Sequence, residues 1–119
     1  MTCSDAAVDQ SVLLFKACAD PTRLRLLSLL LDGERCVCEL VGAVDEAQPK
    51  ISRHLAYLRR AGLVAARKKG LWVHYRLAKP QSPLHRGVLR CLKSGLCDIE
   101  QLDNDRDRLC AAGDQCPVD

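Results

Sequence analysis

The sequence predicts a mainly helical chain with one small β-hairpin, and two features of its hydrophobic pattern support this fold class. Leucine supplies 20 of the 119 residues and aromatic side chains only four, which indicates an aliphatic core packed mostly between helices. The segment 71–77 instead alternates apolar and polar residues, and a period of two is typical of a half-buried strand. A chain of this length usually forms one domain.

The first 43 residues are predicted to form three helices. The first runs from about Asp9 to Ala19, after a loose segment over residues 1–8. The second begins at Asp20-Pro21, where Asp is a good N-cap and Pro suits the first turn, and it ends at Asp32-Gly33. Its buried stripe consists of Leu24, Leu27, Leu30 and Leu31. The third helix runs from Glu34 to about Ala43.

A fourth helix, over about 48–60, has the features of a DNA-reading element. Pro49 is compatible only with its first turn, and Ile51, Leu55 and Leu58 form one buried stripe. The opposite face carries donors and cations without a carboxylate, namely Gln48, Lys50, Ser52, Arg53, His54 and Tyr57. A short helix with such a face fits the major groove of double-stranded DNA. An ordinary solvated face is the alternative for this helix taken alone.

The turn over 42–47 joins the third and fourth helices into a predicted helix-turn-helix. Ala47 stands where a capping side chain is expected, so the helix start either frays or is capped by Asp45.

A β-hairpin follows the fourth helix. Its predicted strands cover about 64–67 and 71–77, with Lys68-Lys69-Gly70 as the turn. Such a wing is expected to lie over DNA phosphates and to position the helix without reading sequence. The wing residues expected at the DNA are Arg67, Lys68, Lys69 and His74. The whole arrangement is a winged helix-turn-helix.

The last predicted helix, over about 83–95, has an apolar stripe with little left to pack on: Leu84, Val88, Leu89 and Leu92. Together with the N-terminal helix, it is expected to form a homodimer interface, which suits a protein that reads a palindrome. Residues 1–97 thus form one DNA-binding and dimerisation domain. The acidic, broken composition from residue 98 onward predicts a flexible, cysteine-containing tail over 98–119.

Charge is distributed unevenly along the chain. The net charge is +3, but residues 47–97 contain twelve Lys and Arg and no Asp or Glu. This block predicts a polyanion as partner, with a solvated basic face as the alternative. No apolar run approaches the roughly 18 residues needed to span a bilayer, and the N-terminus does not resemble a signal peptide. The sequence therefore predicts a cytoplasmic protein with no membrane partner.

Cysteine is unusually frequent: Cys3, Cys18, Cys36, Cys38, Cys91, Cys97, Cys110 and Cys116. In a secreted mini-protein they would predict disulfides, but the expected compartment is reducing and the core needs no cross-links. So many thiols indicate binding of a soft metal or metalloid, or redox sensing. A purely structural role as small buried residues is the alternative for Cys36 and Cys38, whereas Cys18 is expected to be a core residue.

Two motifs carry a family resemblance. Gln48-Pro49-Lys50-Ile51-Ser52-Arg53-His54-Leu55 and Trp72-Val73-His74-Tyr75-Arg76-Leu77 closely resemble the ArsR/SmtB winged-helix repressors, above all the arsenical-responsive ones. The similarity runs from about Leu14 through Leu77. It implies a homodimer that leaves its operator when an inducer binds. It also implies that Gln48, Ser52 and His54 face bases or nearby phosphates, with Lys50 and Arg53 at the backbone.

The resemblance also implies a thiolate site for trivalent arsenic at Cys36 and Cys38, although Val41 occupies the place of the family's third cysteine. As(III) prefers three thiolates. Residues i and i+2 of a regular helix point about 200° apart, so both can bind one ion only if the helix start is unwound or distorts. That distortion is the predicted switch.

Two thiolates suffice for a monoalkylated arsenical, but inorganic arsenite calls for a third. The candidate third ligands, in order, are Cys91 or Cys97, then Cys110 and Cys116, then Cys3. The four C-terminal cysteines are also a candidate second thiol cluster.

The predicted function is a transcriptional repressor induced by As(III) or Sb(III), with no catalytic cofactor. One alternative is induction by Cd(II) or Pb(II) at Cys3, Cys36 and Cys38, and another is a thiol redox switch. An enzyme such as an arsenate reductase is not supported, because the sequence has no phosphate-binding Gly-rich loop. A zinc site on the last helix is not expected either, because that segment offers only His85, which is taken as a surface residue.

Overall fold

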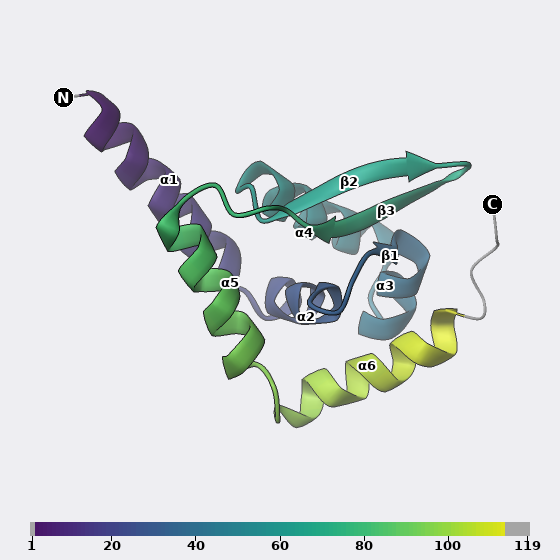
Figure 1. Cartoon of the computed structure of the whole chain (residues 1–119). Coiled ribbons are helices and arrows are strands. Elements are labelled where there is room, and N and C mark those ends of the chain that lie inside the picture. Colours follow the sequence, from purple (N-terminus) through teal and green to yellow (C-terminus); the bar gives the residue numbers. More distant parts are fainter. Residues whose placement is uncertain (1, 114–119) are drawn as a thin grey trace.

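The structure, a computed structural model, describes the backbone of residues 2–113 and the side chains of residues 6–109. Its elements follow in the order α1 (Thr2–Cys18), α2 (Pro21–Leu30), β1 (Arg35–Cys36), α3 (Val37–Val44), α4 (Gln48–Arg60), β2 (Val64–Lys69), β3 (Trp72–Leu77), α5 (Pro83–Gly95) and α6 (Glu100–Gly113) (Figure 1). This confirms a mainly helical fold with a small antiparallel sheet. Within the described part of the chain, none of the helices has the length and apolarity that crossing a bilayer requires.

The N-terminal helices differ from prediction at one end only. The loose segment expected over residues 1–8 is instead part of α1 from Thr2 onward. The start of α2 is confirmed, because the Asp20 carboxylate accepts a hydrogen bond of 3.1 Å from the backbone N–H of Arg23, and Pro21 occupies the first turn.

The predicted third helix begins later than expected. Arg35 and Cys36 form the short strand β1, which pairs antiparallel with Tyr75 and His74 of β3. Cys36 has extended backbone angles, φ −70° and ψ 148°, and its N–H donates to the Glu39 carboxylate at 3.0 Å. Helix α3 therefore starts only at Val37, because the two preceding residues are held by sheet pairing.

Helix α4 forms as the apolar spacing predicts, with Ile51, Leu55 and Leu58 fully buried. Its N-cap, Ala47, makes no side-chain capping bond. Asp45, the alternative cap, instead ends α3 in the left-handed conformation with φ 60°.

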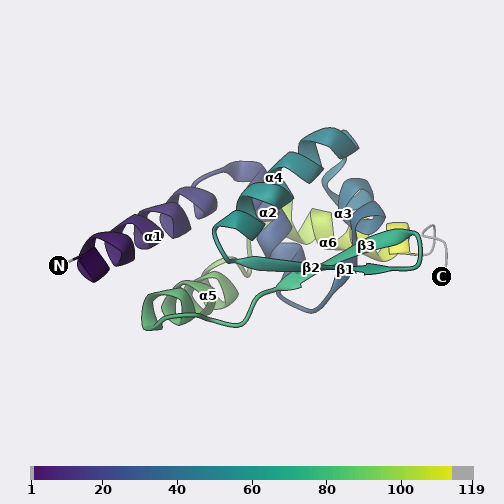
Figure 2. The ribbon, with the colours of Figure 1, turned by 90° about the horizontal axis from the view of Figure 1, so that it is seen from above.

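The wing is a three-stranded sheet with the order β1-β3-β2. Strand β2 extends to Lys69, which pairs with Trp72, so the hairpin turns at Gly70 and Leu71 and not at the predicted Lys68-Lys69-Gly70. Gly70 has φ 62°, which a glycine adopts at little cost, and this lets both lysines remain in the strand. Figure 2 shows the tip of the β2–β3 hairpin extending past α3 and α4.

The terminal helices α1 and α5 pack partly on the core and partly face outward. Leu92 of α5 is buried, and Val88, Leu89 and Leu96 lie half-buried against the core. The expected unpartnered stripe is thus largely covered within the chain. The exposed apolar residues of these helices are Val8, Val12 and Phe15 of α1 and Leu84 of α5.

The described part of the segment predicted as a flexible tail is a packed helix, which corrects that prediction. Helix α6 lies against α3 and α2 (Figures 1 and 2) and buries Leu102 and Leu109. Asp105 is 0% exposed and pairs with Arg25 of α2 at 2.8 Å. The spacing of 102, 105 and 109 places these residues on one helical face, a periodic signal that the acidic composition obscured.

Candidate functional site

The outward face of α4 carries part of the predicted DNA-contacting set. Gln48 and Arg53 are exposed, and Ser52 is half-buried. The ammonium group of Lys50 lies 3.1 Å from the Glu46 carboxylate, so its charge is partly compensated. Within the described residues, no acidic side chain forms an ion pair with Arg53. The face therefore presents amide, hydroxyl and guanidinium groups, which suit base edges and phosphates.

His54 and Tyr57, which were predicted on the same face, turn toward α2 and lie half-buried. The His54 Nδ1 atom lies 3.4 Å from the guanidinium of Arg23 and 3.7 Å from the Asp20 carboxylate. The Arg23 guanidinium also stacks 4.1 Å from the centre of the Tyr57 ring. The α4 side chains free to enter a groove are thus fewer than the helical pattern suggested.

Arg23 is a residue of this region that the sequence pattern did not indicate. Its guanidinium donates to the carbonyl oxygens of Ala17 at 2.8 Å and Lys16 at 2.9 Å, so it joins the end of α1 to α4. In the sequence, Arg23 stands out only as a residue of the capped first turn of α2. That position indicates where a helix begins but does not predict contacts with α1 and α4.

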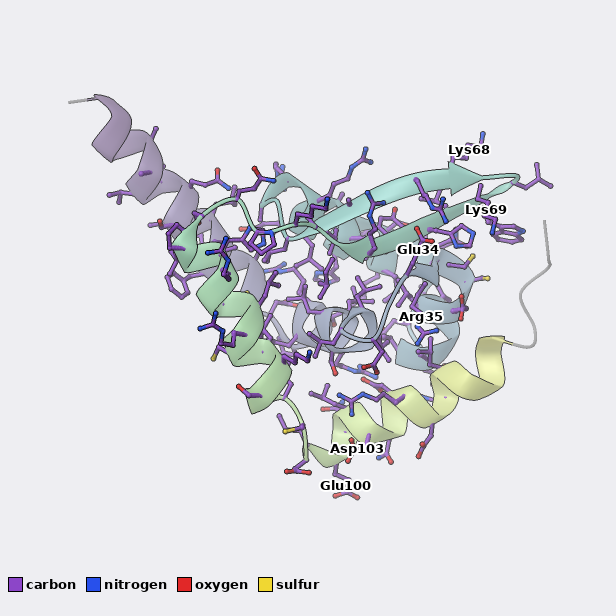
Figure 3. The ribbon with its side chains drawn as sticks, viewed as in Figure 1. Glu34, Arg35, Lys68, Lys69, Glu100 and Asp103 are labelled. Carbon is purple, nitrogen blue, oxygen red and sulfur yellow. The ribbon has the colours of Figure 1, made fainter. Side chains whose placement is uncertain are left out.

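Strand β2 of the wing carries two lysines without an acidic partner among the described residues and one paired arginine. Lys68 and Lys69 are exposed on β2 near the hairpin tip (Figure 3), and within the described residues neither has an acidic partner. Arg67 instead donates two hydrogen bonds of 2.7 Å to the Glu34 carboxylate. This pairing lowers the pKa of Glu34 and raises the pKa of Arg67. Both lysines remain available to phosphates, whereas the Arg67 charge is neutralised.

The structure brings two cysteine sulfurs together at the start of the helix-turn-helix. Cys36 is 3% exposed at the end of β1, and Cys38 is half-buried in the first turn of α3. Their Sγ atoms are 3.1 Å apart. The expected angular separation of about 200° does not apply, because Cys36 precedes the helix. The chain is thus already extended at Cys36, which is the unwound start that the sequence spacing required, and the two sulfurs approach each other without further distortion of α3.

Cys36 lies within the wing sheet as well as beside α3, because its backbone pairs with His74 of β3. His74, which was predicted to contact DNA, is half-buried at this pairing. The thiol pair thus lies where the first helix of the helix-turn-helix meets the sheet of the wing. The Cys36 thiol is free, and the Cys38 sulfur is disulfide-bonded.

Cys91 and Cys97, the first candidates for a third ligand, are not brought to this pair. Both are exposed, on α5 and just after it, and Figures 1 and 2 place α5 and α3 on opposite sides of α2. The Cys97 thiol donates to the Ser94 carbonyl at 3.0 Å. Over the described residues, no cluster of three or more His, Cys, Asp or Glu side chains forms a metal site.

The remaining cysteines are divided between the core and the chain ends. Burial raises the pKa of the half-buried Cys18 thiol, which disfavours its thiolate. The side chains of Cys3 and Cys110, and the whole of Cys116, lie outside the described residues.

His85 is buried, not at the surface as predicted. It is 4% exposed, its Nδ1 atom accepts a hydrogen bond of 3.0 Å from the backbone N–H of Gln81, and burial lowers its pKa. The ring therefore stabilises the turn into α5 as a neutral imidazole.

The comparisons with known proteins agree with this architecture. Residues 20–66 match the family model described as "Bacterial regulatory protein, arsR family". The chain is 48% identical to "Arsenic resistance transcriptional regulator ArsR1" of Pseudomonas putida over 111 residues, covering 89% of this chain and 84% of the relative. It is 61% identical over 66 residues to the "Arsenical resistance operon repressor" of Escherichia coli, covering 55% of this chain and only 56% of that protein.

A solved homodimeric winged helix-turn-helix DNA-binding domain from Mycobacterium bovis superposes with a TM-score of 0.67 at 32% identity. The match covers 78% of this chain and 81% of that domain.

Proposed function

This chain belongs to the arsR family of bacterial regulatory proteins, and from that premise we propose that it is a repressor induced by trivalent arsenic or antimony. The observation that carries this proposal is the 3.1 Å separation of the Cys36 and Cys38 sulfurs at the junction of wing and helix-turn-helix. Soft thiolates are the ligands that a soft metalloid prefers. Two relatives named for arsenic or arsenical resistance support the same ligand class.

Operator binding is assigned to α4 and the wing. Gln48, Ser52 and Arg53 enter the major groove, where amide and hydroxyl groups read base edges and the guanidinium contacts bases or phosphates. Lys68 and Lys69 contact phosphates beside the groove. Arg67 contributes little, because Glu34 already compensates its charge.

The protein acts as a homodimer in this proposal. Val12, 45% exposed, and Phe15, 55% exposed, present apolar side chains on α1, and Leu84 of α5 is exposed as well. Exposed apolar patches of this kind are typical of interaction sites. The homodimeric state of the solved Mycobacterium bovis domain supports the assignment.

Induction follows from the position of the sulfur pair. In this proposal, ligation fixes the two sulfurs, already 3.1 Å apart, in the geometry that the ion requires, and this shifts β1 relative to α3. Since β1 pairs with β3, the same shift changes the angle between wing and α4. A dimer that must match two half-sites loses affinity when these elements are misaligned.

Operator release, measured by fluorescence anisotropy of labelled operator DNA in a phosphine reductant, tests the proposal. Arsenite or antimonite should release the wild type but not Cys36→Ser, whereas Cys97→Ser, a distant exposed thiol, should respond like the wild type. Release by cadmium or lead but not by arsenite would contradict the proposed inducer.

A second candidate function is a thiol redox switch, which the disulfide at Cys38 favours. Peroxide in the absence of reductant would then release the operator, and arsenite in reductant would not.

A further inference from the structure

We propose that Arg23 is a positioning residue that fixes α4 relative to the end of α1 and thereby sets the half-site spacing that the dimer accepts. The proposal rests on the function proposed above, in which a homodimer binds a palindromic operator. It deepens that function by naming the side chain that couples the proposed dimer helix to the proposed DNA-contacting helix. Three features carry it: the attachment of α1, the contacts of the Arg23 guanidinium, and its place between the two helices.

Helix α1 is attached to the rest of the chain through its C-terminal half. Among its described residues only Leu14 and Ala17 are buried, whereas residues 6–10 are all exposed. Figure 1 shows the helix extending away from the body of the molecule toward the N-terminus. The direction of α1 therefore depends on how its last turns are held.

Arg23 holds the last turn of α1 by its backbone. The final carbonyl groups of a helix have no partner within the helix and carry partial negative charge. The Nε atom of Arg23 donates to the Ala17 carbonyl at 2.8 Å, and its Nη2 atom donates to the Lys16 carbonyl at 2.9 Å. Because the guanidinium is planar, two donors that are held at once fix its orientation.

The same guanidinium contacts the flank of α4. Its central carbon lies 4.1 Å from the centre of the Tyr57 ring, and its Nη1 atom lies 3.4 Å from the Nδ1 atom of His54. A guanidinium has only donors, so Nδ1 accepts this bond and the neutral imidazole carries its proton on Nε2. His54 and Tyr57 are three positions apart and therefore lie on one face of α4. Arg23 thus contacts two side chains of α4 while it holds the end of α1.

A second contact between α1 and α4 is weaker. The Gln10 side chain donates to the carbonyl of Ala61, the C-cap of α4, at 3.2 Å. Gln10 is an exposed, neutral donor, whereas hydrogen bonds from a guanidinium are charge-assisted and about twice as strong. The two contacts lie at different points along α1 and together define its direction relative to α4, with the larger share from Arg23.

The position of Arg23 has a consequence for DNA recognition. Phe15, one of the exposed side chains proposed for the dimer interface, directly precedes the two residues whose carbonyls Arg23 holds. The two α4 helices of a dimer must match half-sites about 34–36 Å apart. One additional base pair moves the half-sites by about 3.4 Å. A dimer in which the angle between α1 and α4 is loosened should therefore discriminate less between spacings.

The test measures spacing preference directly. The probe is the palindromic operator that the full-length wild type selects from a random DNA library, with versions that have one base pair added or removed at the centre. Fluorescence anisotropy under phosphine reductant gives the ratio of affinities for the selected and altered operators. Coupling between two sites typically changes an affinity by about 5–150-fold, so this ratio should fall at least about fivefold in Arg23→Gln. Partial unfolding does not change the ratio, because it scales all affinities alike.

Two further arginine variants separate geometry from charge. Arg60→Gln is the matched control, since it removes the same charge and a guanidinium 5.1 Å from the Tyr57 ring, but Arg60 belongs to the last turn of α4. Its ratio should equal that of the wild type. Arg23→Lys keeps the charge, but an ammonium group cannot donate to two carbonyls and stack on the ring in the same way. This variant should therefore also lose spacing preference.

Tyr57→Leu removes the α4 side of the contact and leaves the α1 side intact. It should lower the ratio as well, and its effect should not multiply with that of Arg23→Gln, because both remove one contact. If sedimentation velocity shows Arg23→Gln to be monomeric, Tyr57→Leu alone decides. Gln10→Ala should change the ratio less than Arg23→Gln does.

Four results would overturn the assignment: an unchanged ratio in Arg23→Gln or in Tyr57→Leu, a wild-type ratio in Arg23→Lys, an equal loss in Arg60→Gln, or a larger loss in Gln10→Ala. Failure of the wild type to select a palindromic site would instead overturn the proposed function.

Discussion

The backbone of Cys36 pairs with that of His74, so one residue belongs both to the thiol pair and to the sheet of the wing. This pairing joins a strand of only two residues to the central strand of the sheet. Even a small movement of Cys36 must therefore displace β3 or the start of α3. A change at the thiol pair should accordingly be measurable in the wing.

Metalloid binding should change the fluorescence of Trp72. This residue is the only tryptophan of the chain and lies on β3, two positions from His74. If ligation shifts β1, the half-buried indole changes its environment even without DNA. Emission spectra during arsenite titration should change for the wild type and for Cys97→Ser but not for Cys36→Ser. A bound metalloid with constant emission would show that the wing does not sense the site.

The double variant Lys68→Ala with Lys69→Ala should weaken binding to cognate and random DNA alike. Removing one phosphate interaction should reduce the slope of log affinity against log salt by about 0.9. The control, Arg67→Ala with Glu34→Ala, also removes two wing-region charges but deletes a neutral pair, so it should leave the slope unchanged. Titrations at several salt concentrations provide the measurement. A lower slope in the control would mean that Arg67 contacts DNA.

Ser52→Ala should bind the cognate operator more weakly with little change on other DNA, because its hydroxyl is proposed to face the groove from α4. Removing one hydrogen bond to a base costs about 1–3 kcal/mol of discrimination. Arg53→Ala serves as the comparison. If the guanidinium binds a phosphate, this variant should weaken binding to all DNA sequences equally. Competition assays with operator and scrambled DNA separate the two effects. Equal weakening on both DNAs for Ser52→Ala would remove this residue from base readout.

Val12→Asp with Phe15→Asp should convert the dimer to monomers with poor operator affinity. Both side chains are exposed on α1, so the fold should survive a change that a dimer interface does not tolerate. Leu71→Asp, 87% exposed at the wing tip, is the matched control and should remain dimeric. Sedimentation velocity distinguishes the species. An unchanged dimer in the double variant would place the interface elsewhere.

Acidification should destabilise the fold in part through His85. Burial lowers the pKa of His85 below its ordinary value of about 6.5, so the unfolded chain binds a proton more readily than the native one. Stability from this group is thus complete above the unfolded pKa and falls as the pH drops toward the native pKa. Urea unfolding between about pH 7.5 and 5.5 should show a smaller decline for His85→Gln than for the wild type. An equal decline of the unfolding free energy with falling pH in both proteins would contradict this direction of the His85 effect.

The local elements of the DNA-binding part could be predicted from the sequence. The Asp20-Pro21 start of α2, the apolar stripe of α4 and the alternation in β3 each lie within one segment and appear in the structure. Helix caps, the period of 3.6 and the period of two reflect interactions between near neighbours. The candidate thiol pair Cys36 and Cys38 followed from the family resemblance, and the structure brings the two sulfurs to 3.1 Å.

Only the tertiary structure decided which of the predicted site residues remain exposed to a ligand and which are engaged in contacts within the chain. Two residues are too few for a periodic pattern, so β1 could be recognised only through its pairing with β3. The partner of Arg67 lies 33 positions away, and that of Arg25 lies 80 positions away. The docked α6, the stacked Arg23 and the converging sulfurs arise likewise from segments that meet only after folding. Local periodicity carries no information on such interactions, because their free energy depends on burial and charge pairing between distant parts of the chain.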